Sequence, residues 1–274
     1  MGFFDKIKAG LKKTRDSITG QINSMLHAFT KIDEELFEEL EELLVMADVG
    51  MNTATEICDT LRARVKERGI TVAHVVSSSK FAMKCEEAGV DAIVAEGFEA
   101  GGHNGREETT TLCLIPAVRE ATTLPLIAAG GIGTGEAIFA LMALGAEGVQ
   151  MGTRFALTDE SSASDIFKEY CLRLNEGDTK LLLKKLAPTR LVTNSFRDRV
   201  EAAEGRGASA EELRELLGRG RAKKGIFEGD LEEGELEIGQ VAALFRRRQS
   251  VDEVMKELLE GYRRASDKIR SAGL

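Results

Sequence analysis

One histidine of this chain stands among glycines that directly follow a short apolar run. Residues 91–95 form the run, which is typical of a buried strand, and residues 96–105 continue as EGFEAGGHNG, with His103 near the end. Glycine lets a backbone turn sharply and approach a cofactor closely, and this stretch holds Gly97, Gly101, Gly102 and Gly105. Imidazole, with a pKa near neutrality, is suited to removing a proton. We expect a loop to present His103 as a catalytic base beside a flat cofactor; the alternative is a histidine that only closes the loop through hydrogen bonds.

Two further glycine-bearing strand ends follow, LIAAGGI at residues 126–132 and GVQMGTRF at residues 148–155. Bare backbone amides can approach phosphate oxygens, a helix that starts after such a loop adds the positive end of its dipole, and a threonine hydroxyl can also donate. The residues that suit this role are Gly130, Gly131, Gly152 and Thr153. A single glycine pair usually marks a tight turn, but two such loops at successive strand ends favour a phosphate site.

These loops need alternating strands and helices to position them. From residue 71 onward, short apolar runs alternate with helical patterns, as they do in parallel β/α units. The pattern predicts strands at residues 71–76, 91–95, 126–129 and 149–151, with helices between them at residues 78–89, 110–121 and 135–144. Ser78 or Ser79 can cap the first helix, and Gly89 can close it. Because the glycine-rich loops follow strands, we expect an α/β fold of the TIM-barrel type, with the ligand at the carboxyl ends of the strands.

A complete barrel of this type has eight strands, and the pattern supplies about four. We therefore expect residues 71–160 to form a half-barrel that carries the cofactor site. Two copies of the chain could pair their half-barrels into a closed sheet, which would hide the strand edges in a homodimer. Residues 161–274 are predicted to be a mostly helical extension, with an extended break at residues 187–192. Its last amphipathic helix would carry Val251, Val254, Leu258 and Tyr262 on one side.

Residues 1–70 differ from the rest because they carry charged helical patterns and no strand-like run, so an all-helical segment is predicted. At its start, lysines surround an apolar face made of Phe3, Phe4, Ile7 and Leu11. A helix of this kind over residues 3–13 can make a peripheral contact with an anionic membrane surface. An ordinary amphipathic helix packed on its own domain is the more frequent case.

Composition narrows the classes of function. The chain has 274 residues, of which 43% are hydrophobic, and this is enough for a sizeable core. Its formal net charge of -9 argues against general nucleic-acid binding, so nucleic acid is not an expected partner. The four cysteines are widely separated and lack histidines at ligand spacing, so neither a zinc site nor a disulfide scaffold is expected. No apolar run of membrane-spanning length and no signal peptide is found, which favours a cytoplasmic location.

Together, the three glycine-bearing motifs resemble the nitronate monooxygenase (2-nitropropane dioxygenase) family, which includes the flavin-dependent enoyl-ACP reductases II. The resemblance runs from about residue 71 to the C-terminus and implies an FMN-dependent oxidoreductase that oxidises alkyl nitronates or nitroalkanes with oxygen. By position, it implies that His103 is the catalytic base or proton donor beside the flavin. It also implies an FMN site lined by Glu96, Gly97, Gly130, Gly131, Gln150, Gly152 and Thr153. In related enzymes a Gly-Gln pair returns to the active site, which adds Gly239 and Gln240.

The same resemblance implies a second reaction, the reduction of an enoyl thioester with NAD(P)H and FMN. The family's first half, with an early Gln-Gly-Gly-Met turn and an Asn-bearing strand, has no counterpart here. In its place, residues 1–70 resemble the helical N domain of the bacterial signal recognition particle receptor, through IDEELFEELEELL at residues 32–44 and MADVG at residues 46–50. This second resemblance implies a fusion or chimera. No Gly-x-x-x-x-Gly-Lys-Ser/Thr loop follows, so GTP hydrolysis is not implied, and a non-catalytic, membrane-associating helical module is the third function that we consider.

Overall fold

The computed structural model describes Leu40 and residues 71–272, and it divides the chain into two compact units, residues 1–74 and 75–274. Several predictions concern residues 1–39 and 41–70 and lie outside the described residues. These are the helical N-terminal part, the apolar face over residues 3–13 and the receptor-like segment. Among the helices that the structure describes, none is long and apolar enough to cross a membrane.

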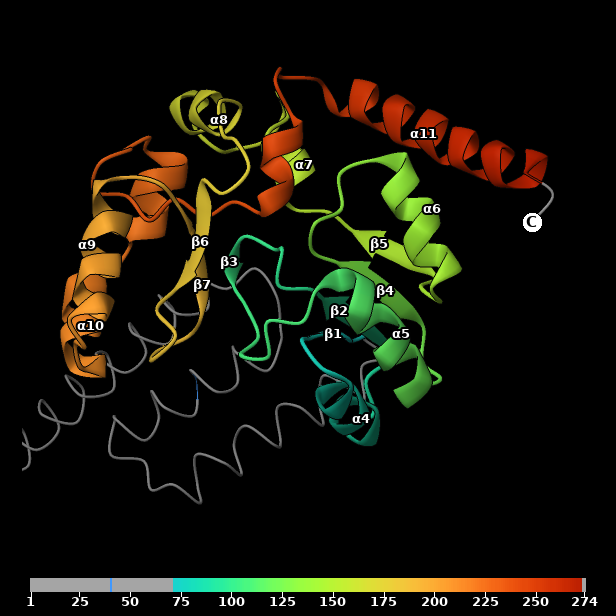
Figure 1. Ribbon diagram of the computed structural model, residues 1–274, viewed down its shortest axis with the longest axis horizontal. Helices are drawn as coiled ribbons and strands as arrows, with labels where there is room; N and C mark the ends of the chain where they lie inside the picture. Colours follow the sequence, from blue (N-terminus) through green and yellow to red (C-terminus); the bar gives the residue numbers. More distant parts are fainter. Residues whose placement is uncertain (1–39, 41–70, 273–274) are drawn as a thin grey trace, which may run out of the picture. The chain divides into compact units, whose positions relative to one another are not determined.

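A four-stranded sheet carries the three glycine-bearing loops (Figure 1). Its order is β1-β2-β4-β5, formed by β1 (Ala73–Val76), β2 (Ala92–Glu96), β4 (Leu126–Ala129) and β5 (Gly148–Gln150). Strands β2 and β4 are parallel, with Ile93 opposite Leu126, and β4 and β5 are parallel, with Ile127 opposite Gly148. The four predicted strands are therefore confirmed. The loops after β2, β4 and β5 leave the sheet at the same edge.

Helices follow β1, β2 and β4, as predicted. They are α4 (Ser79–Glu87), α5 (Thr111–Ala121) and α6 (Gly135–Ala143). Ser78 caps α4 by accepting a hydrogen bond from the Phe81 amide at 3.4 Å, and Thr134 caps α6 by accepting one from the Ala137 amide at 3.2 Å. Such caps satisfy amides that the first helical turn leaves without partners. The glycine predicted to close the first helix, Gly89, follows α4 with a φ of +80°.

The core between this sheet and its helices is made from the apolar runs of the sequence. Ile93, Leu126 and Ala128 of the strands are fully buried and pack with Ile115 and Val118 of α5. Full burial of a side chain the size of isoleucine or leucine stabilises a fold by about 1.5–3 kcal/mol. This packing fixes β2, β4 and β5 side by side and so determines where their loops meet.

A second sheet, of which sequence reasoning predicted only the extended segment at residues 187–192, holds the predicted catalytic histidine. It is antiparallel in the order β3-β7-β6, with β3 (Gly102–His103), β6 (Thr179–Leu182) and β7 (Thr189–Val192). His103 pairs with Thr189 of β7, so the expectation that only a loop holds His103 is wrong. Strand β3 is too short to give a hydrophobic period, and its pairing depends on β7, which lies far along the chain.

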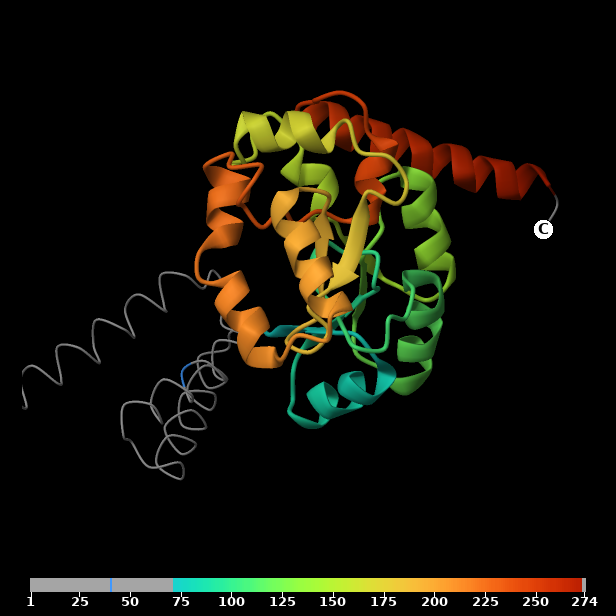
Figure 2. The same cartoon turned by 60° about the vertical axis from the view of Figure 1, so that its left-hand side comes forward.

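The rest of the second unit is mostly helical. After the short α7 (Thr153–Ala156) come α8 (Asp165–Cys171), α9 (Ser195–Gly205), α10 (Ala210–Leu217), the π-helical turn η1 (Lys223–Phe227), the 3₁₀ turn η2 (Gln240–Leu244) and α11 (Val251–Ser271). The predicted last helix is confirmed as α11, in which Val254 and Leu258 are buried. Helix α11 packs along α6 (Figure 2), and the rings of Phe139 and Tyr262 meet edge to face at 5.6 Å.

Candidate functional site

A cavity of about 260 Å³ lies where the loops after β2, β4 and β5 meet. Its lining includes many of the predicted cofactor-binding residues: Glu96, Gly101, Gly130, Gly131, Gln150, Gly152 and Thr153. These residues come from three motifs that are far apart in the sequence. The carboxyl edge of a parallel sheet is where α/β proteins bind ligands, because the glycine-rich loops and helix N-termini gather there.

Free backbone amides line this cavity. Within residues 71–272, no main-chain carbonyl accepts a hydrogen bond from the amides of Gly130, Gly131, Gly152 or Thr153, and we call these four groups the amide cluster. A Cβ atom added at Gly152 would have no other atom within 4 Å, so this backbone faces open space. Amides left without partners in two neighbouring loops can donate to the oxygens of a phosphate group. The residues present therefore fit the phosphate end of FMN.

The loop after β2 and the loop after β4 contact each other closely next to the cavity. The Gly97 amide donates to the Ala129 carbonyl at 3.0 Å, and a Cβ atom on Gly130 would lie only 2.5 Å from the Gly97 carbonyl oxygen. On the other side of Gly97, an added Cβ atom would lie 2.1 Å from Thr111 Oγ1. Gly97 does not line the cavity itself. The structure assigns it to the contact that brings the loop after β2 against the loop after β4.

Arg190 holds the loop after β2 in place. Its guanidinium is almost fully buried and donates to the Phe98 carbonyl at 2.5 Å and to the Ala100 carbonyl at 3.1 Å. It also lies 4.9 Å from the centre of the Phe98 ring, a distance typical of a cation–π contact. Nothing in the sequence around residue 190 marks this role, because the contact partners lie about 90 positions earlier.

The Gly-Gln pair reaches the site through its backbone. The Gly239 amide donates to Thr153 Oγ1 at 3.0 Å, and the Gln240 amide donates to the Glu99 carbonyl at 3.0 Å. These two hydrogen bonds hold residues 237–241 beside the cavity. Glu237, Ile238 and Val241 of this segment line the cavity. Gly239 and Gln240 are not part of the lining, although both stand next to residues that are.

His103 and Gly102 lie beside the cavity and outside its lining. The His103 side chain is exposed, while Gly102 is buried with a φ of +74°. A Cβ atom on Gly102 would lie 2.8 Å from Glu237 Oε2, so only a glycine leaves room for that carboxylate. The predicted base therefore stands two residues after Gly101, which lines the cavity.

Sequence reasoning missed one titratable group of the lining, Glu237. Burial, and to a smaller degree the negative charge of Glu235, raise the pKa of its carboxyl from the ordinary range to about 7. In the sequence Glu237 belongs to an acidic stretch that looks like a solvated surface. The alternation of glutamates with Leu236 and Ile238 over residues 235–238 is the signal in the sequence for a strand-like segment.

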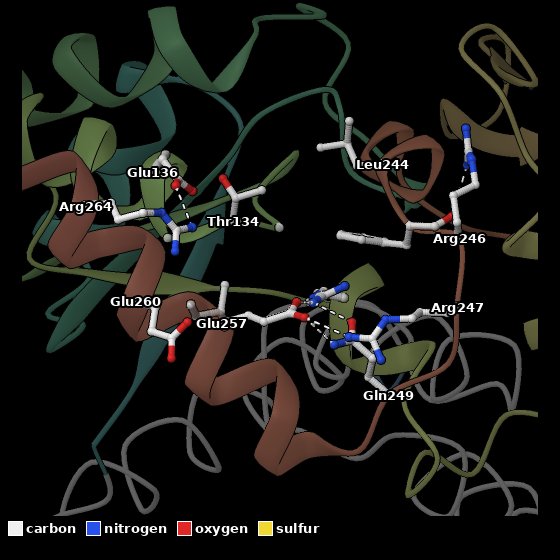
Figure 3. Close-up of a pocket in the computed structure, with 14 residues that line it drawn as sticks. Thr134, Glu136, Leu244, Arg246, Arg247, Gln249, Glu257, Glu260 and Arg264 are labelled. Atoms are coloured by element: carbon white, nitrogen blue, oxygen red, sulfur yellow. Dashed lines mark hydrogen bonds and ion pairs between the residues drawn. The ribbon is translucent and has the colours of Figure 1, made fainter. Parts of the chain in front are cut away.

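A larger cavity, of about 520 Å³, lies between the start of α6 and helix α11 (Figure 3) and contains none of the predicted site residues. Several of its charged side chains pair with one another: Arg264 with Glu136 at 3.1 Å (Figure 3), and Arg154 with Glu257 at 2.6 Å. The lining holds four arginines and three glutamates, so its charges nearly balance, and most of them are already used in ion pairs. The smaller cavity is therefore the candidate functional site.

Comparison with known proteins points to one family. A family model described as nitronate monooxygenase matches residues 22–261, beginning upstream of the boundary predicted near residue 70. A probable nitronate monooxygenase of Staphylococcus aureus strain JH9 is 37% identical over 158 residues, which cover 54% of this chain and 44% of the relative. One from Staphylococcus saprophyticus is 40% identical over 149 residues, which cover 50% of this chain and 41% of the relative. The chain thus spans less than half the length of these curated relatives.

Two solved structures resemble the chain in fold and sequence. FabK from Thermotoga maritima superposes with a TM-score of 0.72 and 36% identity, over 76% of this chain and 66% of that one. Nitroalkane oxidase from Streptomyces ansochromogenes superposes with a TM-score of 0.62 and 30% identity, over 76% of this chain and 61% of that one.

Proposed function

Because this chain belongs to the nitronate monooxygenase family, we propose that it is an FMN-dependent oxidoreductase that oxidises alkyl nitronates or nitroalkanes with oxygen. The observation that carries this proposal is the meeting of three separate motifs in one cavity with free backbone amides. The similarity to nitroalkane oxidase from Streptomyces ansochromogenes supports the same class of substrate.

In this proposal the amide cluster holds the FMN phosphate, and Glu96 and Gln150 offer polar side chains to the rest of the cofactor. FMN, when bound, supplies the chemistry of accepting two electrons from the substrate and passing them to oxygen. His103 takes the α-proton of a neutral nitroalkane, and its exposed side chain on β3 can be reached from solvent. A nitronate has already lost that proton and does not need the base.

We further propose that the four-stranded sheet is part of a (β/α)₈ barrel. Strands β1 and β5 are the outer strands of the described sheet, and further strands would pair with them. In a homodimer, the second copy of the chain would supply these further strands. The greater length of the curated relatives supports a larger barrel in the family.

A second candidate is the reduction of enoyl thioesters with NAD(P)H, which the resemblance of the same three motifs to enoyl-ACP reductases II supports. Anaerobic mixing of the FMN-loaded full chain separates the two reactions. We expect ethylnitronate to bleach the visible flavin band and NADH to leave it unchanged. Bleaching by NADH together with no response to ethylnitronate or nitroethane would contradict the proposed oxidation.

His103→Asn tests the role of the base within that experiment. Anaerobic reduction by neutral nitroethane should slow by about 100-fold or more, since general base catalysis contributes about 10²–10⁴-fold. Reduction by ethylnitronate should stay within about twofold, because the α-proton is already gone. Equal slowing with both substrates would show that His103 acts on something other than the α-proton.

A further inference from the structure

The candidate site contains a carboxyl group that the proposed reaction does not use. Residues 235–239 run beside β7, where Glu237 forms an antiparallel bridge with Leu191 and the Val192 amide donates to the Leu236 carbonyl at 2.8 Å. Leu236 and Ile238 are buried, at 1% and 4% exposure. The pairing with β7 and the burial of Leu236 and Ile238 hold this segment in place, and Glu237 lines the cavity beside Ile238.

The surroundings of the half-buried Glu237 side chain supply it with no partner among the described residues. The Oε2 atom of Glu237 faces Gly102, and a Cβ atom added to Gly102 would lie only 2.8 Å from it. In the part of the chain that the structure describes, no hydrogen bond or ion pair reaches this carboxylate. A buried charge without a partner is costly, and a carboxyl group avoids that cost by keeping its proton.

The negative charge of Glu235 adds to the effect of burial. Burial and the charge of Glu235 raise the pKa of the Glu237 carboxyl to about 7, so it is close to half protonated at neutral pH. Because this value lies above that of an unfolded chain, the contribution of Glu237 to stability falls as the pH rises from about 4.5 through 7.

The charged and titratable groups on the elements packed around it are Glu235 on its own segment, Arg190 on β7, His103 on β3, Glu96 on β2 and Glu99 in the loop after β2.

We propose that the protonation state of Glu237 controls ligand binding in this cavity: its protonated form donates a hydrogen bond to an anionic ligand bound there, and its ionised form repels that ligand. The proton stays on Glu237 in the complex, and no bond of the ligand changes. Ligand binding in the cavity therefore depends on pH through this one carboxyl. The identity of the ligand as FMN rests on the proposed function, whereas the ionisation of Glu237 does not.

The first test needs no ligand. The full chain is labelled with glutamate carrying ¹³C at the carboxyl position, and the carboxyl resonances are followed by NMR as the pH is raised. We expect one resonance to titrate near pH 7 and to be missing from Glu237→Gln. Glu235→Gln serves as the matched control, since Glu235 is also buried but does not line the cavity; the Glu237 resonance should remain there, with its midpoint at lower pH. A midpoint below pH 5.5 for the resonance lost in Glu237→Gln would overturn the proposal.

The second test measures FMN affinity at pH 6 and pH 8.5. With a pKa of about 7, the protonated fraction of Glu237 falls about 30-fold between pH 6 and pH 8.5. If only the protonated form binds the anion, the FMN affinity of the wild type should fall about 30-fold more over this pH range than the affinity of Glu237→Gln. Glu235→Gln should keep most of this pH dependence. The same pH dependence in wild type and Glu237→Gln would overturn the proposal. Failure of FMN to bind any variant at either pH would contradict the proposed function, and the NMR midpoint alone would then decide whether the cavity holds a neutral carboxyl.

Discussion

Gly152→Asp should weaken FMN binding by the full chain about 100-fold while leaving its stability unchanged. Gly152 has an ordinary helical φ of −88°, is exposed and has no atom near the position of a Cβ, so an aspartate fits without strain. Its carboxylate would stand at the amide cluster, where the phosphate is proposed to bind. Repulsion between these negative charges at the surface of the cavity is worth about 3 kcal/mol, which corresponds to about 100-fold in affinity.

Gly152→Asn is the matched control, because asparagine has nearly the same shape as aspartate and no charge. We expect its FMN affinity to stay within about fivefold of the wild type, and urea unfolding to be the same for both variants. Fluorescence quenching of FMN gives the affinities. Equal losses in Gly152→Asp and Gly152→Asn would place the phosphate away from Gly152.

Gly130→Ala should lower the free energy of unfolding by about 3 kcal/mol and should also weaken FMN binding. The φ of Gly130 is +89°, which costs an alanine about 1–2 kcal/mol. In addition, its Cβ would lie 2.5 Å from the Gly97 carbonyl oxygen and 2.9 Å from the Gly97 amide nitrogen. Both are backbone atoms and cannot rotate away, so the loops after β2 and β4 must separate, with a further cost of about 1–3 kcal/mol.

Gly207→Ala isolates the effect of the backbone angle. Gly207 has a φ of +84° and no atom within 4 Å of an added Cβ, and it lies outside the cavity lining. Urea unfolding should show a loss of about 1 kcal/mol for this variant, with FMN affinity unchanged. If Gly130→Ala and Gly207→Ala lose the same stability, the close contact between Gly97 and Gly130 does not exist in solution.

The parallel sheet and most of the cavity lining could be predicted because their signals are local. A run such as residues 126–129 is apolar, short and followed by two glycines, and each of these properties is set by neighbours in the sequence. Parallel strands also end at a common edge, so residues that follow them, such as Gly131 and Gly152, were expected to meet. The cavity lining agrees with that expectation.

The parts that were missed depend on contacts distant in sequence. Strand β3 has two residues and exists because β7 pairs with it, and Arg190 acts on carbonyls about 90 positions earlier. The pKa of Glu237 is raised by burial, which no single residue type reveals. For the same reason sequence patterns alone placed His103 in a loop, whereas β7 supports it from the side.

The central claim is that the cavity formed by the three motifs binds FMN, and a titration of the purified full chain with FMN tests it most directly. The visible absorption spectrum of the fresh protein and the quenching of added FMN are recorded together. We predict a flavin spectrum and one FMN bound per chain, with binding reduced about 100-fold in Gly152→Asp. A colourless protein that takes up no added FMN would contradict the account.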